Sequence, residues 1–138
     1  MWSELNTPDD FRRDWYGELT NQCGHTLGGV LCAAFVAFGW LYAFGEFPPK
    51  VYIIAACALP YTVLIEWWVQ GWRSGDSWFD AAMWIFGALG PCLALSEVVV
   101  DGVVYLAPHP ERVAVVVVAW AVFLGARVLK RYAASTVT

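Results

Sequence analysis

Four long apolar runs constrain the fold of this chain more than any other feature of its sequence. They cover residues 26–46, 51–72, 78–97 and 112–131, and each is close to the ~20 residues that an α-helix needs to cross the hydrocarbon core of a bilayer. Hydrophobic residues make up 59% of the chain and charged residues 14%, against about 45–50% and about 25% in soluble domains. The sequence therefore predicts an all-α integral membrane protein, a four-helix transmembrane bundle.

A polar segment precedes the first run. Within residues 1–24, Phe11, Trp15, Leu19 and Cys23 recur at every fourth position, and charged residues occupy the other faces. This pattern predicts a short amphipathic helix in the membrane interface; a solvated helix packed on the cytoplasmic loops is the alternative. Because polar residues come first, no cleavable signal peptide is expected. The expected division is an N-terminal segment (1–24), a transmembrane domain (25–132) and a cytoplasmic tail (133–138).

Helix-breaking residues interrupt the apolar pattern at several places. Asp101, Gly102 and two prolines preclude a continuous helix over residues 98–111, and the sequence leaves open whether part of this stretch re-enters the membrane. Pro60 and Pro91 lie inside the second and third runs, where each removes a helix hydrogen bond. We expect a kink at both positions.

The basic residues predict the orientation in the membrane. With four spans, both termini lie on the same side as the loop at 71–77. That side collects six basic residues: Arg12, Arg13, Arg73, Arg127, Lys130 and Arg131. Only Lys50 and Arg112 lie on the other side, so the positive-inside rule places both termini in the cytoplasm, with the chain in the cell inner (plasma) membrane.

Small residues repeat at helical spacing in the first and third runs. The candidate packing positions are Gly24, Gly28, Gly29, Ala33, Gly87 and Gly90. Such small-xxx-small faces let two helix backbones approach closely. Packing within one bundle is the simpler interpretation, and a dimer face is the alternative.

Polar residues near one end of the runs form the candidate site. Glu66, Gln70 and Arg73 fall within about a quarter of the circumference of one helix. His25 and Asp80 begin the first and third runs at a similar height. Polar side chains in a membrane usually face the interior of a protein or a wet cleft. We therefore predict a polar pocket at the cytoplasmic leaflet, formed by these five residues.

Each of these residues also has a purely structural explanation. Asp80 follows Ser77 at the spacing of a capping box. Glu66 can pair with Arg73 or His25 and pin two helices together. His25 can be a hydrogen-bonded interfacial histidine without a chemical role. It is their convergence on one layer that favours a functional site.

Several function classes lack their sequence signals. The four cysteines form no CxxC pair and no histidine lies at metal-ligand spacing, so neither a metal nor a disulfide framework is expected. No glycine-rich phosphate loop, HExxH or GxSxG motif is present, and we expect no cofactor. A nucleic-acid partner is not expected either, because the net charge is -4 and no basic block occurs.

The polar residues resemble the signature of the VanZ-like membrane proteins. That signature has the form E-x3-Q, an Arg-containing turn, Asp, and then Asn with a glycine pair, often after an early His. The matching residues here are His25, Glu66, Gln70, Arg73, Asp80, Gly87 and Gly90. The chain departs from the pattern at Trp84, where Asn is expected, and it lacks a Lys beside the early His. The similarity covers about half the chain.

Three functions remain open on these observations. The resemblance implies a small envelope protein, of a family linked to teicoplanin resistance, whose pocket binds or processes the headgroup of a lipid or envelope precursor. In that pocket Arg73 can bind a phosphate and Glu66 or Asp80 can accept a proton. The second interpretation is a non-catalytic structural or accessory subunit of a membrane complex. The third is a phage-type holin or pore-former. Membrane lipids are the expected partners, and homo-oligomerisation stays open.

Overall fold

The computed structural model of the chain describes residues 14–69, 71 and 76–136. In chain order its elements are α2 (Trp15–Phe44), α3 (Lys50–Pro60), the π-helix η1 (Tyr61–Val69), α4 (Asp76–Ala94), β1 (Leu95–Val100), β2 (Val103–Pro108) and α5 (Pro110–Thr136). The described part of the chain is therefore mostly helical, as the sequence predicts.

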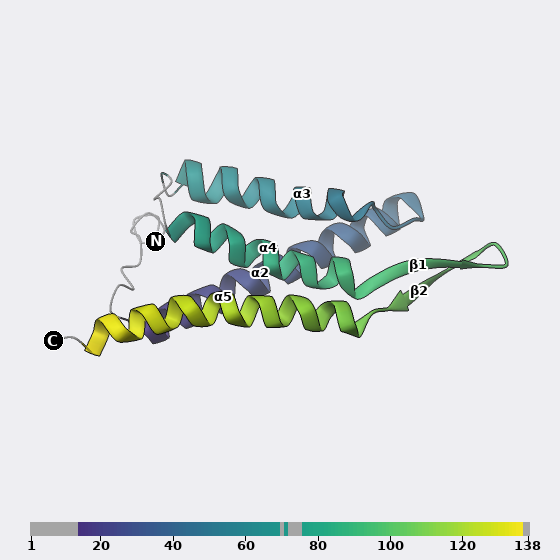
Figure 1. The fold of residues 1–138 in the computed structure, drawn as a ribbon. Helices are drawn as coiled ribbons and strands as arrows, with labels where there is room; N and C mark the ends of the chain where they lie inside the picture. Colours follow the sequence, from purple (N-terminus) through teal and green to yellow (C-terminus); the bar gives the residue numbers. More distant parts are fainter. Residues whose placement is uncertain (1–13, 70, 72–75, 137–138) are drawn as a thin grey trace.

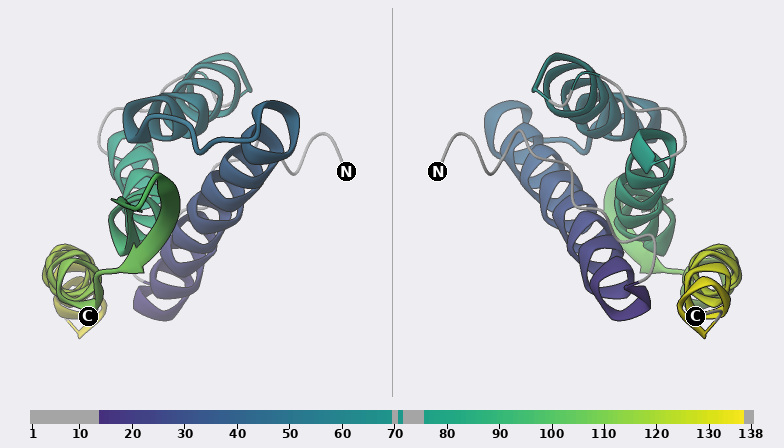
Figure 2. Two further views of the ribbon diagram at one scale, coloured as in Figure 1. Left: turned by 90° about the vertical axis from the view of Figure 1, so that its right-hand side faces the viewer. Right: turned by 90° about the vertical axis from the view of Figure 1, so that its left-hand side faces the viewer.

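The helices lie side by side, with α4 between α3 and α5 (Figure 1). The long helix α2 crosses behind α4, from the C-terminal part of α5 to the start of α3, and makes its most extensive contact with α4 (Figures 1 and 2). The start of α2, the end of η1, the start of α4 and the end of α5 share one end of the molecule (Figure 1). We refer to this end as end A, and to the opposite end, from which the β1–β2 hairpin projects, as end B.

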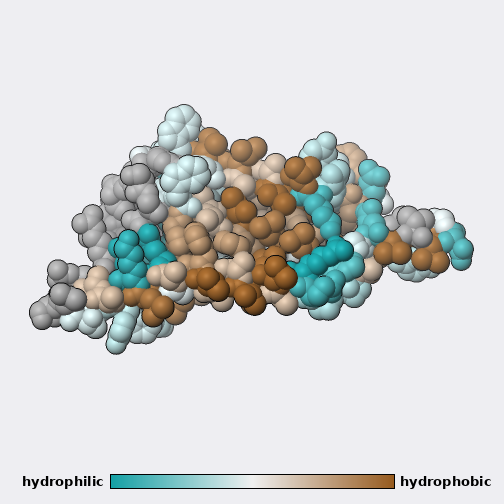
Figure 3. All heavy atoms as spheres, viewed as in Figure 1, coloured by the Kyte–Doolittle hydropathy of each residue, from teal (hydrophilic) through white to brown (hydrophobic). Residues whose placement is uncertain are grey.

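Three helical segments are long and apolar enough to cross a membrane: Trp15–Phe44, Lys50–Val69 and Pro110–Thr136. Only 11%, 22% and 6% of their most apolar windows are buried within the protein, so most apolar side chains point outward. Hydrophobic residues cover the middle of the face in Figure 3, and hydrophilic residues gather toward its two ends. Exposed apolar surface of this extent is stable in lipid and costly in water. The chain is a membrane protein.

Three predicted glycines let α2 and α4 approach closely. A Cβ at Gly29 would collide with the carbonyl oxygen of Trp84, and one at Gly87 with the carbonyl oxygen of Thr26. A Cβ at Gly28 would meet the indole of Trp84. Ala33 is fully buried in the same contact region. The small residues therefore pack within the chain, as the simpler interpretation predicts.

Two predicted packing residues do not serve this contact. No atom lies within 4 Å of a Cβ built at Gly24 or Gly90, and Gly24 is exposed. Within the described part of the chain neither glycine therefore makes a close helix contact, and a dimer face stays a prediction. Spacing alone does not place Gly24 against α4, because the rotation of the helix turns it away.

The N-terminal segment differs from its prediction. Helix α2 begins at Trp15, with Asp14 Oδ1 accepting a hydrogen bond from the Gly17 amide (2.8 Å), and continues unbroken to Phe44. Residues 15–24 are thus the first turns of the long helix and not a separate amphipathic helix. No proline interrupts them, and their polar side chains find partners on other helices. The remainder of the predicted helix, residues 1–13, lies outside the described residues.

Pro60 changes the helix type in the second apolar run. At this residue α3 gives way to η1, and the Tyr61 amide bonds the Ala58 carbonyl instead of the Cys57 carbonyl that regular α-helix would use. The disturbance that proline was expected to cause is therefore a switch to π-helix. At this switch the Trp84 indole donates a hydrogen bond to the Cys57 carbonyl at 3.1 Å.

The third apolar run ends earlier than predicted. Helix α4 stops at Ala94, and residues 95–97 belong to strand β1, which pairs antiparallel with β2. Both residues of the tight turn have positive φ (52° at Asp101 and 78° at Gly102), as a type I′ hairpin requires. The Asp-Gly pair between valine-rich runs is a hairpin signal, although it was predicted only to break a helix.

The last helix is longer than the fourth apolar run. It extends from Pro110 to Thr136, so residues 133–136 of the predicted tail are helical. At its start His109 ties the helix to the base of the hairpin: the ring contacts Ser96 Oγ at 2.5 Å, and the amide donates to the Ala94 carbonyl at 2.7 Å. His109 is thus hydrogen-bonded at a junction and not part of a solvated turn.

The glycine contact makes a specific stability prediction. Gly29→Ala should destabilise the fold by about 1–3 kcal/mol, because the added methyl group forces α2 and α4 apart. The measurement is unfolding of the purified protein in mixed micelles, followed by the loss of helical circular dichroism. Gly24→Ala is the matched control on the same helix, and it should leave the protein at least as stable, since the methyl group meets no atom. Equal behaviour of the two variants would contradict the proposed contact.

Candidate functional site

His25, Tyr61 and Glu66 form a hydrogen-bonded chain at end A. Tyr61 Oη donates to Glu66 Oε1 at 2.6 Å and lies 2.9 Å from His25 Nδ1. Glu66 is fully buried and Tyr61 is 6% exposed. The switch to π-helix places the tyrosine at the first residue of η1, on the same element as the glutamate it contacts. The chain thereby connects η1 with α2.

The number of hydrogens on these three groups limits how they can hydrogen-bond to one another. A tyrosine hydroxyl has one hydrogen, so if Tyr61 donates to Glu66 it accepts from His25, whose Nδ1 then carries hydrogen. The other ring nitrogen, Nε2, lies 3.7 Å from Asp80 Oδ2. A bare nitrogen lone pair facing a carboxylate would be repulsive. The geometry therefore favours a proton between His25 and Asp80, on one of the two groups.

Gln22 and Glu18 extend the polar contacts to α5. The Gln22 amide donates to Asp80 Oδ1 (2.5 Å) and to Glu18 Oε1 (3.2 Å). Glu18 also accepts from Arg127 Nε at 3.1 Å, and its second oxygen lies 3.4 Å from Arg131 Nε. Both Glu18 and Gln22 are 2% exposed. One continuous series of contacts thus runs from Glu66 on η1 through α2 and α4 to the two arginines of α5.

We call this series the end A polar network. Its members are Glu18, Gln22, His25, Tyr61, Glu66, Asp80, Arg127 and Arg131. Thr26 borders it: its hydroxyl donates to the Gln22 carbonyl and accepts from the Trp120 indole, both at 2.9 Å. Helices α2, α4 and α5 and the π-helix η1 therefore each contribute a polar side chain to the same layer.

Trp84 covers the network from the core side. Its ring stacks on Tyr61 with centroids 4.3 Å apart and planes 15° from parallel, and the ring also rests against Gly28. Together with the bond to the Cys57 carbonyl, these contacts fix the tyrosine that bridges His25 and Glu66. This chain thus has Trp84, which holds Tyr61 in place, at the position where the VanZ-like signature has Asn.

Two buried acceptors in the network lack hydrogen-bond donors among the described residues. They are Glu66 Oε2 and Gln22 Oε1. Leaving a buried polar atom unsatisfied costs about 1–3 kcal/mol, more when the group is charged. Such exceptions are rare in folded proteins, and they mark places where a donor can bind.

The structure brings together three of the five predicted site residues: His25, Glu66 and Asp80. The other two, Gln70 and Arg73, lie outside the described residues. Five network members were missed as site residues: Glu18, Gln22, Tyr61, Arg127 and Arg131. A signal for the first two was present, because residues 18, 22 and 25 share the helix face of Gly29 and Ala33. The predicted boundary at residue 24 assigned residues 18 and 22 to a separate segment, and they were therefore not considered with residue 25.

Among residues 14–69, 71 and 76–136, no group of three or more His, Cys, Asp or Glu side chains is arranged to hold a metal ion. Comparisons of the chain with family models, with curated proteins and with solved structures give no match.

The pairing of Glu18 with two arginines can be tested by stability. Glu18→Ala should destabilise the protein by about 3 kcal/mol, because it removes a buried carboxylate that both Arg127 and Arg131 contact. Unfolding in mixed micelles measures the loss. The matched control is Glu46→Ala, which removes an exposed carboxylate between α2 and α3 and should leave the midpoint unchanged. If Glu18→Ala unfolds like the wild type, the network does not hold α2 to α5.

Proposed function

We propose that this chain is a VanZ-like protein of the cell inner membrane, with four spans and cytoplasmic termini. In this proposal the end A polar network binds or processes the headgroup of a lipid or envelope precursor at the cytoplasmic leaflet. Helix α4 is the fourth span, packed between α2, α3 and α5.

The charges at the two ends support this orientation. Among the described residues, end A contains Arg127, Lys130 and Arg131 of α5, whereas Lys50 and Arg112 begin α3 and α5 at end B. Three tryptophans near end A, namely Trp67, Trp68 and Trp78, are each at least 65% exposed. Tryptophan prefers the headgroup region of a bilayer. End A with its excess of basic residues is thus the cytoplasmic end.

Glu66 is the single observation that carries the functional part of the proposal. Its carboxylate is fully buried, one oxygen accepts from Tyr61, and the other has no donor among the described residues. A hydroxyl or acidic proton of a headgroup would satisfy that oxygen. Glu66 would then accept that proton itself, because the hydrogens on Tyr61 and on His25 Nδ1 already point toward it.

A structural role is the second candidate, and one observation favours it. Glu18 is paired with both arginines, and Gln22 donates to two carboxylates. This half of the network joins three helices through several polar contacts, as expected for a clasp in an accessory subunit. The two candidates therefore make different claims about Glu66 and about Glu18.

A resistance assay separates the two candidates. Expressed in a teicoplanin-susceptible Gram-positive host, the wild-type chain should raise the teicoplanin concentration that inhibits growth. Glu66→Gln should return it to the level of the empty vector, since the amide cannot accept the proton, while the amount of protein in the membrane stays unchanged. Glu46→Gln, at an exposed carboxylate outside the network, is the matched control and should keep full resistance.

The possible results divide as follows. No resistance from the wild-type chain would contradict the VanZ-like assignment. Loss of resistance in Glu66→Gln together with a proportional loss of protein would favour the clasp. Retained resistance in Glu66→Gln would exclude the carboxylate from the activity.

Cysteine labelling tests the orientation. In a background with Cys23→Ser, a cysteine introduced by Glu46→Cys should react with a membrane-impermeant maleimide in intact cells. A cysteine introduced by Ser135→Cys should react only after lysis, because the proposal places the end of α5 in the cytoplasm. The reverse pattern would invert the topology.

A further inference from the structure

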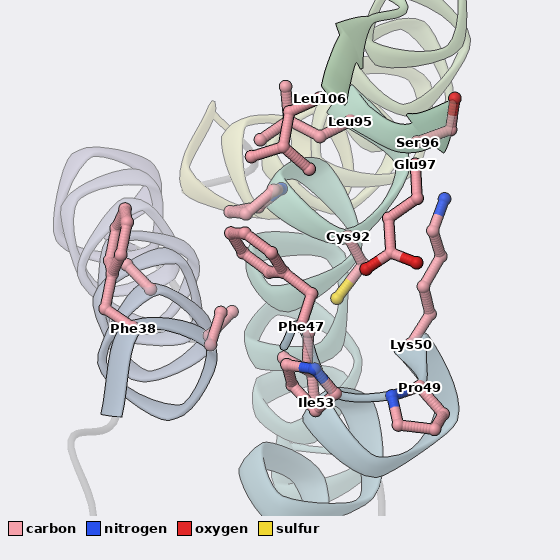
Figure 4. A pocket seen from close by; sticks show the side chains of 15 residues that line it. Phe38, Phe47, Pro49, Lys50, Ile53, Cys92, Leu95, Ser96, Glu97 and Leu106 are labelled. Atoms are coloured by element: carbon pink, nitrogen blue, oxygen red, sulfur yellow. The ribbon is translucent and has the colours of Figure 1, made fainter. Parts of the chain in front are cut away.

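A hollow lies at end B, and the α2–α4 contact separates it from the end A polar network. It has a volume of about 330 Å³ and lies between α2, the start of α3, the end of α4 and the base of the hairpin. Its walls are mainly apolar, and Figure 4 shows Phe38, Phe47, Ile53, Leu95 and Leu106 around the space. In a bilayer such a hollow is open to hydrocarbon chains.

Two opposite charges stand at one side of this hollow. Lys50 is the first residue of α3 and Glu97 belongs to β1; both side chains line the space and lie beside one another in Figure 4. Among the described residues neither forms an ion pair: the salt bridges of end B join Glu111 to His109 and to Arg112. A cation and an anion are therefore held near one another without neutralising one another directly.

We propose that the end B hollow is a binding site for a zwitterionic phospholipid with a primary amine, a phosphoethanolamine lipid of the outer leaflet. One acyl chain occupies the apolar space. The phosphate contacts Lys50 and the first turn of α3, and the ammonium group contacts Glu97.

The volume of the hollow limits how much of the lipid's hydrocarbon can enter it. Small-molecule sites in proteins span about 300–1,000 Å³, and a hollow of about 330 Å³ lies at the lower end of this range, so the proposal assigns it one acyl chain. The second chain of the lipid stays in the bilayer.

The charges of Lys50 and Glu97 determine which lipid headgroup the site prefers. Lys50 lies at a helix N-terminus, where free backbone amides add to the attraction for phosphate. The carboxylate of Glu97 needs a cationic partner that can donate hydrogen bonds, and a primary ammonium provides three hydrogens. A phosphocholine headgroup has no such hydrogen, and a phosphoglycerol headgroup has no cation. The pair thus distinguishes the three headgroups.

Native mass spectrometry of the purified full-length protein in detergent tests the proposal. The probes are phosphatidylethanolamine, phosphatidylcholine and phosphatidylglycerol with identical acyl chains, each titrated separately. The wild type should bind the ethanolamine lipid about tenfold more tightly than the other two. Lyso-phosphatidylethanolamine, which has one chain, should bind like the two-chain lipid, and free phosphoethanolamine should not compete.

Variants assign the two halves of the site. Glu97→Gln should lower the affinity for the ethanolamine lipid to that for the choline lipid and leave the choline lipid unaffected. Lys50→Gln should weaken all three lipids. Ala34→Phe should block all three by filling the hollow, which Ala34 lines. Glu46→Gln, near end B but outside the lining residues, is the matched control and should bind as the wild type does.

Because Glu97 is an exposed residue of the hairpin, its variant is expected to fold, and helical circular dichroism verifies this. Equal affinity of the wild type for the three lipids would overturn the proposal. So would a Glu97→Gln variant that keeps the preference for ethanolamine. The site is independent of the end A polar network, so neither result bears on the resistance assay.

Discussion

The close approach of α2 and α4 is the contact on which the rest of this structure depends. At Gly29 and Gly87 the backbone of each helix occupies the space that a side chain would fill on the other. This spacing lets Gln22 reach Asp80 within a hydrogen bond and brings His25 to the same carboxylate. A wider crossing would separate these groups, and charged side chains would then be left without partners in a low-dielectric layer.

The second consequence of this contact concerns Trp84. An indole fits against Gly28 only because that residue has no side chain, and from there it stacks on Tyr61 and donates to the Cys57 carbonyl. Packing, a helix irregularity and the polar network are thus linked through one residue. The two ends of the molecule then have different characters: buried hydrogen bonds and ion pairs at end A, and an apolar hollow with two charges at its side at end B.

Much of the architecture could be predicted from the sequence because it follows from local chemistry. Runs of apolar residues predicted long helices, and small residues at helical spacing predicted a close helix contact. The convergence of His25, Glu66 and Asp80 was also predictable, since all three lie at the same end of their runs. The boundary at residue 24 was wrong because composition changes there while the helix continues. The hairpin was missed because its valine-rich strands resemble an apolar helix until the Asp-Gly turn is recognised.

The sequence by itself determined that the chain is helical and apolar on its outside, because hydrophobicity and the distribution of prolines are properties of each segment alone. It also determined which residues are chemically able to form a site. Only the tertiary structure decided which of them meet. Glu18 pairs with Arg127 and Arg131, more than a hundred positions away, and Lys50 lies beside Glu97, because helix crossings and not sequence spacing set the distances between side chains. Such long-range pairs depend on the rotation of each helix about its axis, and that rotation is fixed when the glycines of α2 and α4 come into contact.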